Sequence, residues 1–176
     1  MPGIRRFAVV LLVLAAVVVS AFPAQAGAID PNDTPGPLDI SGGTFSRSVS
    51  GGITYLDLHT YGNWTPALLA HHTRNRIFVL FDVDNDGAQD FRGTVQSFGG
   101  RLSISIHGLG QSFDPIRARH PAGNWLQVIL SGDSPPNPLS SWQVAFRSQR
   151  ISATGACTSP CRDRAPDMGW WTVPAA

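Results

Sequence analysis

The chain of 176 residues contains no lysine and no glutamate, because all 13 basic residues are arginine and all 12 acidic residues are aspartate. Glutamate and lysine usually fill exposed helix faces, whereas glycine, proline and aspartate favour turns. The chain has 18 glycines and 14 prolines. This composition predicts an all-β domain, although a nucleotide bias toward arginine codons would by itself explain the missing lysine.

Clustered basic charge is also missing from the sequence. The formal net charge is +1, and the arginines are scattered along the chain. Binding to nucleic-acid phosphates at physiological salt requires a clustered basic surface. Nucleic acid is therefore not an expected partner.

Cysteine is scarce, and its two copies, Cys157 and Cys161, lie in the stretch CTSPC. In an exported protein two such thiols form a disulfide by default, and closing this short loop would stabilise the fold by about 2 kcal/mol. The spacing has one residue more than the C-x-x-C motif of redox and zinc sites. A Cys157–Cys161 disulfide is the prediction, with metal binding or redox catalysis as the alternative.

Long apolar runs are absent except at the start of the chain. A charged beginning, MPGIRR, precedes an apolar run of 16 residues from Phe7 to Phe22 and the small-residue motif Ala24-Gln25-Ala26. This pattern is typical of a secretory signal peptide, residues 1 to 26. A transmembrane anchor is the competing interpretation, but about 20 apolar residues are needed to span a bilayer. We expect a secreted protein without a membrane span once the signal is removed.

The rest of the chain has the organisation of one small domain. Residues 27 to 39 are rich in proline, aspartate and glycine and predict a flexible lead-in. Residues 40 to 176 contain short apolar or alternating runs separated by turn residues: TFSRSV, ITYLDLH, RIFVLFDV, FRGTVQSF, RLSISIH, NWLQVIL, SWQVAFRS and GWWTV. This spacing predicts an antiparallel β-sandwich of about eight strands, jelly-roll or Ig-like.

Three local patterns make the strand prediction specific. RLSISIH places its apolar residues on one face and its polar residues on the other, as a half-buried strand does. Gly99-Gly100 before it predicts a hairpin in which both glycines have positive φ. IFVLF, residues 77 to 81, is apolar throughout, which predicts a central strand buried on both faces.

The stretch FDVDNDGAQDF, residues 81 to 91, places four aspartates directly after that strand. The first, third, fifth and ninth positions of a calcium-loop pattern are occupied by Asp82, Asp84, Asp86 and Asp90. Gly87 occupies the sixth position, where glycine permits a sharp turn. Ca²⁺ accepts six to eight oxygens at about 2.3 to 2.6 Å. The sequence predicts a structural Ca²⁺ site formed by four side chains and one backbone carbonyl: Asp82, Asp84, Asp86, Ala88 and Asp90.

This loop resembles the DxDxDGxxD calcium loops of FG-GAP repeats, thrombospondin type 3 repeats and dockerins. The resemblance covers about nine residues and implies the same ligand set. The pattern departs from an EF-hand, which requires a bidentate glutamate where this chain has Gly93. The mature chain is also similar to small exported bacterial β-sandwich domains in which a strand ends in a D-x-D-x-D-G turn.

The alternative interpretation of this stretch is an acidic hairpin turn whose aspartates cap their own backbone as Asx turns. Four carboxylates within one loop repel one another unless a cation neutralises them. Arg92 alone cannot reach all four. Ca²⁺ is therefore the favoured explanation.

Two other groups of residues predict different functions. Asp57 and His59 lie on one face of a strand, and a carboxylate that orients an imidazole is one part of a nucleophilic active site. The sequence lacks the other parts, because it contains no G-x-S-x-G elbow, no free catalytic cysteine and no H-E-x-x-H motif. Trp64 and one of the pair Trp170 and Trp171 are candidates for stacking on sugars.

We therefore expect a secreted, calcium-stabilised binding or structural module without catalytic activity. A cell-surface glycan or protein is the expected partner class. A carbohydrate-binding module that uses tryptophan and a secreted hydrolase that uses Asp57 and His59 are the alternatives. The sequence does not specify the oligomeric state.

Overall fold

The computed structural model describes residues 25–26, 29–48, 52–113, 117–131, 141–151 and 161–173. The predicted signal peptide lies outside the described residues except for Gln25 and Ala26. Cys157 also lies outside them, so the disulfide to Cys161 stays a prediction. No helix in the described part of the chain is long and apolar enough to cross a membrane.

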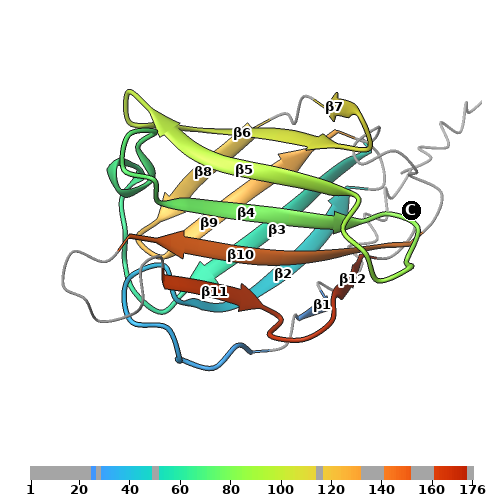
Figure 1. The fold of residues 1–176 in the computed structure, drawn as a ribbon, viewed down its shortest axis with the longest axis horizontal. Helices are drawn as coiled ribbons and strands as arrows, with labels where there is room; N and C mark the ends of the chain where they lie inside the picture. Colours follow the sequence, from blue (N-terminus) through green and yellow to red (C-terminus); the bar gives the residue numbers. More distant parts are fainter. Residues whose placement is uncertain are drawn as a thin grey trace, which may run out of the picture.

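Two antiparallel sheets pack face to face, which confirms the predicted β-sandwich (Figure 1). The first sheet has five strands, in the spatial order β1 (Gln25–Ala26), β2 (Ile40–Ser48), β3 (Ile53–Thr60), β9 (Trp125–Leu130) and β8 (Arg117–Ala122). The second has seven, in the order β11 (Cys161–Ala165), β10 (Trp142–Arg150), β4 (Arg76–Asp82), β5 (Phe91–Phe98), β6 (Arg101–Gly108) and β7 (Gln111–Phe113), with β12 (Trp171–Val173) also paired to β10. In Figure 1 the second sheet lies in front, and β2, β3, β9 and β8 run diagonally behind it.

All eight predicted runs form strands. The four additional strands, β1, β7, β8 and β11, are short or lack an apolar alternation. A single-turn 3₁₀ helix, η1 (Pro66–Leu69), connects β3 to β4. The predicted hairpin is also confirmed, because Gly99 and Gly100 have φ of 57° and 78° and join β5 to β6.

The core lies between the inner faces of the two sheets. β3 contributes every second residue, as the pleat requires. β4 is buried on both faces, as its sequence predicts: it pairs with both β10 and β5, and Ile77 to Asp82 are all buried. β9 is likewise buried from Leu126 to Leu130. The fully buried side chains come from both sheets and include Leu56, Leu58, Phe81, Phe91, Leu126 and Phe146.

Residues 29–39, which we expected to be a flexible lead-in, pack along the edge of the sandwich where β2 approaches β11. Asp30, Leu38 and Asp39 are each at most 3% exposed. The guanidinium of Arg150 donates a hydrogen bond to the carbonyl oxygen of Pro35 at 2.7 Å. It also lies beneath Gly36, where a Cβ atom would clash with it. The lead-in therefore has specific contacts that its composition does not predict.

Candidate functional site

The loop between β4 and β5, residues 82–90, is called the acidic loop below. It closes through a hydrogen bond from the backbone N–H of Asp90 to the carbonyl oxygen of Phe81, at 2.8 Å. Asn85 and Gly87 have φ of 61° and 87°. This left-handed region suits glycine and asparagine, and it turns the chain back on itself within a few residues.

The acidic loop brings three of its four aspartates together. Carboxylate oxygens of Asp82, Asp84 and Asp90 all lie within 4.8 Å of one another. Asp82 is fully buried at 0% exposed. Its Oδ2 accepts a hydrogen bond from the N–H of Gly87 at 2.8 Å, but its Oδ1 is buried without a partner. A buried carboxylate oxygen without a partner is costly, and a cation between the three carboxylates would provide one.

The remaining predicted ligands stand apart from this group. Asp86 is exposed, and its Oδ1 accepts a hydrogen bond from the N–H of Ala88 at 2.7 Å. The Oδ1 of Asp84 accepts from the N–H of Asp86 at 3.2 Å. These two bonds have the pattern of Asx turns, so they are compatible with the alternative interpretation as well as with a metal site. The carbonyl oxygen of Ala88 stays a predicted ligand.

The electrostatics of the acidic loop reflect its crowding. The N–H of Asp86 lowers the pKa of Asp84, but desolvation and the neighbouring charges of Asp86, Asp90 and Asp82 outweigh it, so the pKa is raised. A carboxyl group shifted in this direction is one that its surroundings disfavour as an anion. The loop therefore places negative charge together with too little positive charge to offset it.

Contacts from other segments hold the acidic loop in place. The indole Nε1 of Trp170 donates to the carbonyl oxygen of Gly87 at 3.2 Å. The side-chain amide of Asn85 donates to the carbonyl oxygen of Ser141 at 2.9 Å. The loop is thus anchored to the residue that precedes β10 and to the residue that precedes β12.

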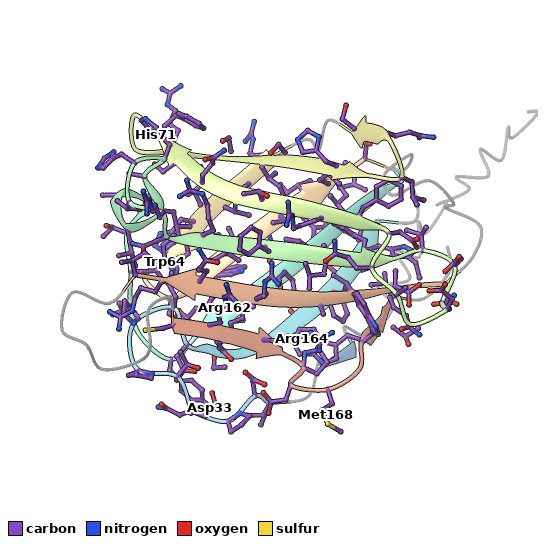
Figure 2. The ribbon with its side chains drawn as sticks, viewed as in Figure 1. Asp33, Trp64, His71, Arg162, Arg164 and Met168 are labelled. Atoms are coloured by element: carbon purple, nitrogen blue, oxygen red, sulfur yellow. The ribbon has the colours of Figure 1, made fainter. Side chains whose placement is uncertain are left out.

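The three candidate tryptophans do not form a common surface. Trp64 is 5% exposed and Trp171 is 7% exposed, so neither offers a ring face for stacking on a sugar. Trp64 packs edge-on against His120, at 4.1 Å between ring centres, and lies at the opposite end of the sandwich from the acidic loop (Figure 2). Trp170 is half-buried.

The Asp57 carboxylate is engaged by residues other than His59. Its Oδ1 accepts hydrogen bonds from Trp125 Nε1 at 2.9 Å and from Gln127 Nε2 at 2.7 Å. The ring of His59 stacks on Trp125, with 5.7 Å between centres. Asp57 therefore orients an indole and an amide rather than an imidazole. Trp125 pairs with His59 across β3 and β9 and lies half-buried on the outer face of the first sheet.

The fold gathers arginines that are scattered in the sequence. Arg92, Arg147, Arg162 and Arg164, called the arginine face below, project from β5, β10 and β11 on the outer side of the second sheet. Figure 2 shows two of them, Arg162 and Arg164, on this front surface. Cross-strand register explains the gathering: Arg147 pairs with Arg164 on one side and with Phe78 on the other.

The arginine face has an aromatic base. The guanidinium groups of Arg147 and Arg92 lie 4.7 and 5.6 Å from the ring centre of Phe78, which is buried with Leu80 and Ala145 beneath them. Burial and the charges of the three other arginines lower the pKa of Arg147. Its Nε is buried without a partner. This surface thus combines clustered positive charge with a buried apolar base.

A second group of carboxylates was not predicted. Five aspartates, called the edge cluster below, meet where residues 29–39 pack on β11: Asp30, Asp33, Asp39, Asp163 and Asp167. Burial, and then the charges of the neighbouring aspartates, raise the pKa of Asp30 to about 7. Burial raises the pKa of Asp163 to about 6, despite N–H groups that donate to it, and it also raises the pKa of Asp39. Sequence spacing cannot reveal this cluster, because its members lie near opposite ends of the chain.

Comparisons with known proteins do not place the chain in a family: no family model, no curated protein and no solved structure matches it.

Proposed function

We propose that the chain is an exported β-sandwich module without catalytic activity, that Ca²⁺ bound at the acidic loop stabilises it, and that it binds a partner outside the cell. The observation that supports the calcium site best is the buried Asp82 carboxylate, whose Oδ1 has no partner although it belongs to a group with Asp84 and Asp90. All of these ligands are oxygens, which suits a hard cation, and the flexible coordination of Ca²⁺ suits a loop better than the strict octahedron of Mg²⁺.

Calcium should raise the melting temperature of the mature protein, and Asp84→Asn should reduce that effect. With a dissociation constant near 10⁻⁴ M, about 1 mM Ca²⁺ would stabilise the fold by about 1.4 kcal/mol, or about 4 °C. In chelator, Asp84→Asn should be at least as stable as the parent, because the substitution removes a carboxylate that its neighbours repel. In calcium it should be the less stable of the two. Paired thermal melts in calcium and in chelator measure both effects.

Asp86→Asn is the matched control, because Asp86 lies in the same loop but outside the group of three carboxylates. It should retain the calcium response.

Tb³⁺ luminescence measures ion binding at this loop directly. The luminescence excited through tryptophan should fall in Trp170→Phe, since Trp170 contacts Gly87. Identical melts of the parent with and without calcium, together with no Tb³⁺ signal from Trp170, would contradict the proposal and favour Asx turns alone.

The arginine face favours a more specific partner, an anionic glycan. Sulfate and carboxylate groups of a polysaccharide match guanidinium groups in charge and geometry. Glycan binding at the arginine face replaces the predicted stacking of sugars on Trp64 and Trp171, because both tryptophans are buried. It also uses a surface that the sequence alone did not indicate.

Binding of heparin and of polygalacturonate, used as sulfated and carboxylated probes, should weaken about tenfold in Arg162→Gln and should weaken as salt rises. Arg162 is exposed, so its substitution should leave the fold intact. Arg117→Gln is the control, because Arg117 is an exposed arginine on the other sheet. Equal losses in the two variants would contradict the proposal. Duplex DNA bound as tightly as both glycans would show general polyanion binding instead.

A further inference from the structure

The edge cluster lies far from the acidic loop in sequence and is built from different strands. Asp30, Asp33 and Asp39 precede β2, Asp163 lies in the middle of β11, and Asp167 follows β11. The Oδ2 of Asp163 accepts a hydrogen bond from the backbone N–H of Ile40, the first residue of β2. In Figure 2 the labelled Asp33 lies below β11, and Met168 marks the turn that contains Asp167.

Backbone contacts fix the position of Asp30 and Asp39. The N–H of Asp30 donates to the carbonyl oxygen of Ser41 at 3.3 Å, and the N–H of Tyr61 donates to the carbonyl oxygen of Asp39 at 2.8 Å. The hydroxyl of Tyr61 donates to the carbonyl oxygen of Asp30 at 2.5 Å. The Oδ1 of Asp39 also accepts a hydrogen bond from the N–H of Thr34 at 3.4 Å, whereas the contacts of Asp30 use only its backbone atoms.

Three of the five carboxylates are removed from water. Asp30 is 3% exposed, Asp39 is 2% exposed and Asp163 is 5% exposed. Oxygen atoms of Asp30, Asp163 and Asp167 lie within 4.8 Å of one another, and so do those of Asp33, Asp39 and Asp163. Buried charges are retained in proteins when they are paired or coordinate a metal.

One carboxylate oxygen of Asp30 is buried without a hydrogen-bond partner. The Oδ2 of Asp30 is buried and accepts no hydrogen bond, although the side chain is more than nine-tenths buried and belongs to the first group of three. The nearby guanidinium of Arg164 donates to the carbonyl oxygens of Pro166 and Gly169 instead. That of Arg150 donates to Pro35. Among the described residues, both guanidinium groups thus donate to backbone carbonyls, and Arg164 acts on the cluster only through the attraction between its charge and that of Asp167.

We propose that Asp30, Asp163 and Asp167 form a second binding site for a hard divalent cation, which fastens residues 29–39 to β11. The three carboxylates supply only oxygen ligands, and this selects Ca²⁺ or Mg²⁺ over softer metals. Asp163 also faces Asp33 and Asp39, so a cation bound to it reduces the repulsion within both groups. The site does not depend on the acidic loop, and either can be lost without the other.

The test is the number of Ca²⁺ ions bound per chain, measured on the mature protein by equilibrium dialysis with metal analysis. Asp167→Asn should bind one ion fewer than the parent. Asp167 is exposed, so its substitution should not prevent folding. Asp84→Asn should also lose one ion, and the double variant should lose both. A second series with Mg²⁺ alone shows which of the two cations the site retains.

The rate of protease cleavage within residues 29–39 tests, independently of the ion count, whether a bound cation holds this segment against β11. Calcium should slow this cleavage in the parent and in Asp84→Asn, but not in Asp167→Asn. Asp57→Asn, which retains an acceptor oxygen for Trp125 and Gln127, serves as the control. An unchanged ion count and unchanged cleavage in Asp167→Asn, with the loss of one ion in Asp84→Asn, would overturn this inference and leave the proposed function standing.

Discussion

Phe146→Ala should lower the melting temperature by about 10 to 15 °C, because it removes about 3 to 5 kcal/mol of stability. Phe146 lies on β10 at the centre of the core and is 0% exposed. Its ring packs against Trp171, with 5.9 Å between ring centres. Since small domains have a total stability of about 5 to 15 kcal/mol, this loss is a large part of the whole. Thermal and urea unfolding measure it.

The matched control for Phe146 is an aromatic residue on the same sheet that contributes little to the core. Phe98, at the end of β5, is 51% exposed and stacks on His71 at 5.2 Å. Phe98→Ala should cost about 1 kcal/mol or less. Equal losses in the two variants would mean that the buried layer between the sheets is not the source of stability.

Gly108→Ala should both destabilise the sandwich and abolish the calcium response of the acidic loop. A Cβ atom on Gly108 would clash with the carbonyl oxygen of Asp90 and would meet the Cα of Phe91 at 2.7 Å. Both contacts are to backbone, so no side-chain rotation can relieve them. Overpacking of this kind costs about 3 kcal/mol. The displaced residue, Asp90, is one of the three clustered carboxylates, and calorimetric titration with Ca²⁺ should record the loss.

Gly99→Asn is a control for this substitution. Gly99 has φ of 57°, a Cβ atom added to it would meet nothing within 4 Å, and asparagine tolerates this left-handed conformation. The stability and calcium response of this variant should match those of the parent. A Gly108→Ala variant that binds Ca²⁺ normally would show that the position of Asp90 is not critical for the site.

The strands that sequence patterns predicted are those with a regular apolar side. β6 alternates along its whole length, and β4 is apolar throughout, so periodicity identifies both without any knowledge of their partners. β11 shows the opposite case. Its inward positions are Cys161, Asp163 and Ala165, and a buried aspartate in the middle hides the alternation. β11, one of the four strands that the sequence patterns missed, is thus the one that contributes a carboxylate to the edge cluster.

Among the candidate sites, too, the sequence indicates only the one that is formed by a single local segment. The acidic loop is local, so the spacing of its aspartates is visible in the sequence, although only the fold shows that Asp86 stands outside the group of three. The arginine face and the edge cluster depend on register between strands. Arg147 and Arg164 become neighbours only through the pairing of β10 with β11. Asp30 and Asp163 meet only because residues 29–39 pack against the edge of the sandwich, and local patterns contain no information about such contacts.

The bond between Ile40 and Asp163 joins residues 123 positions apart. Contacts of such long sequence separation form slowly, since a large loop must close before they contribute. The edge of the sandwich at β2 and β11 can therefore be completed only after the polypeptide has been synthesised as far as β11. A cation bound at this edge would therefore stabilise contacts that form late in folding.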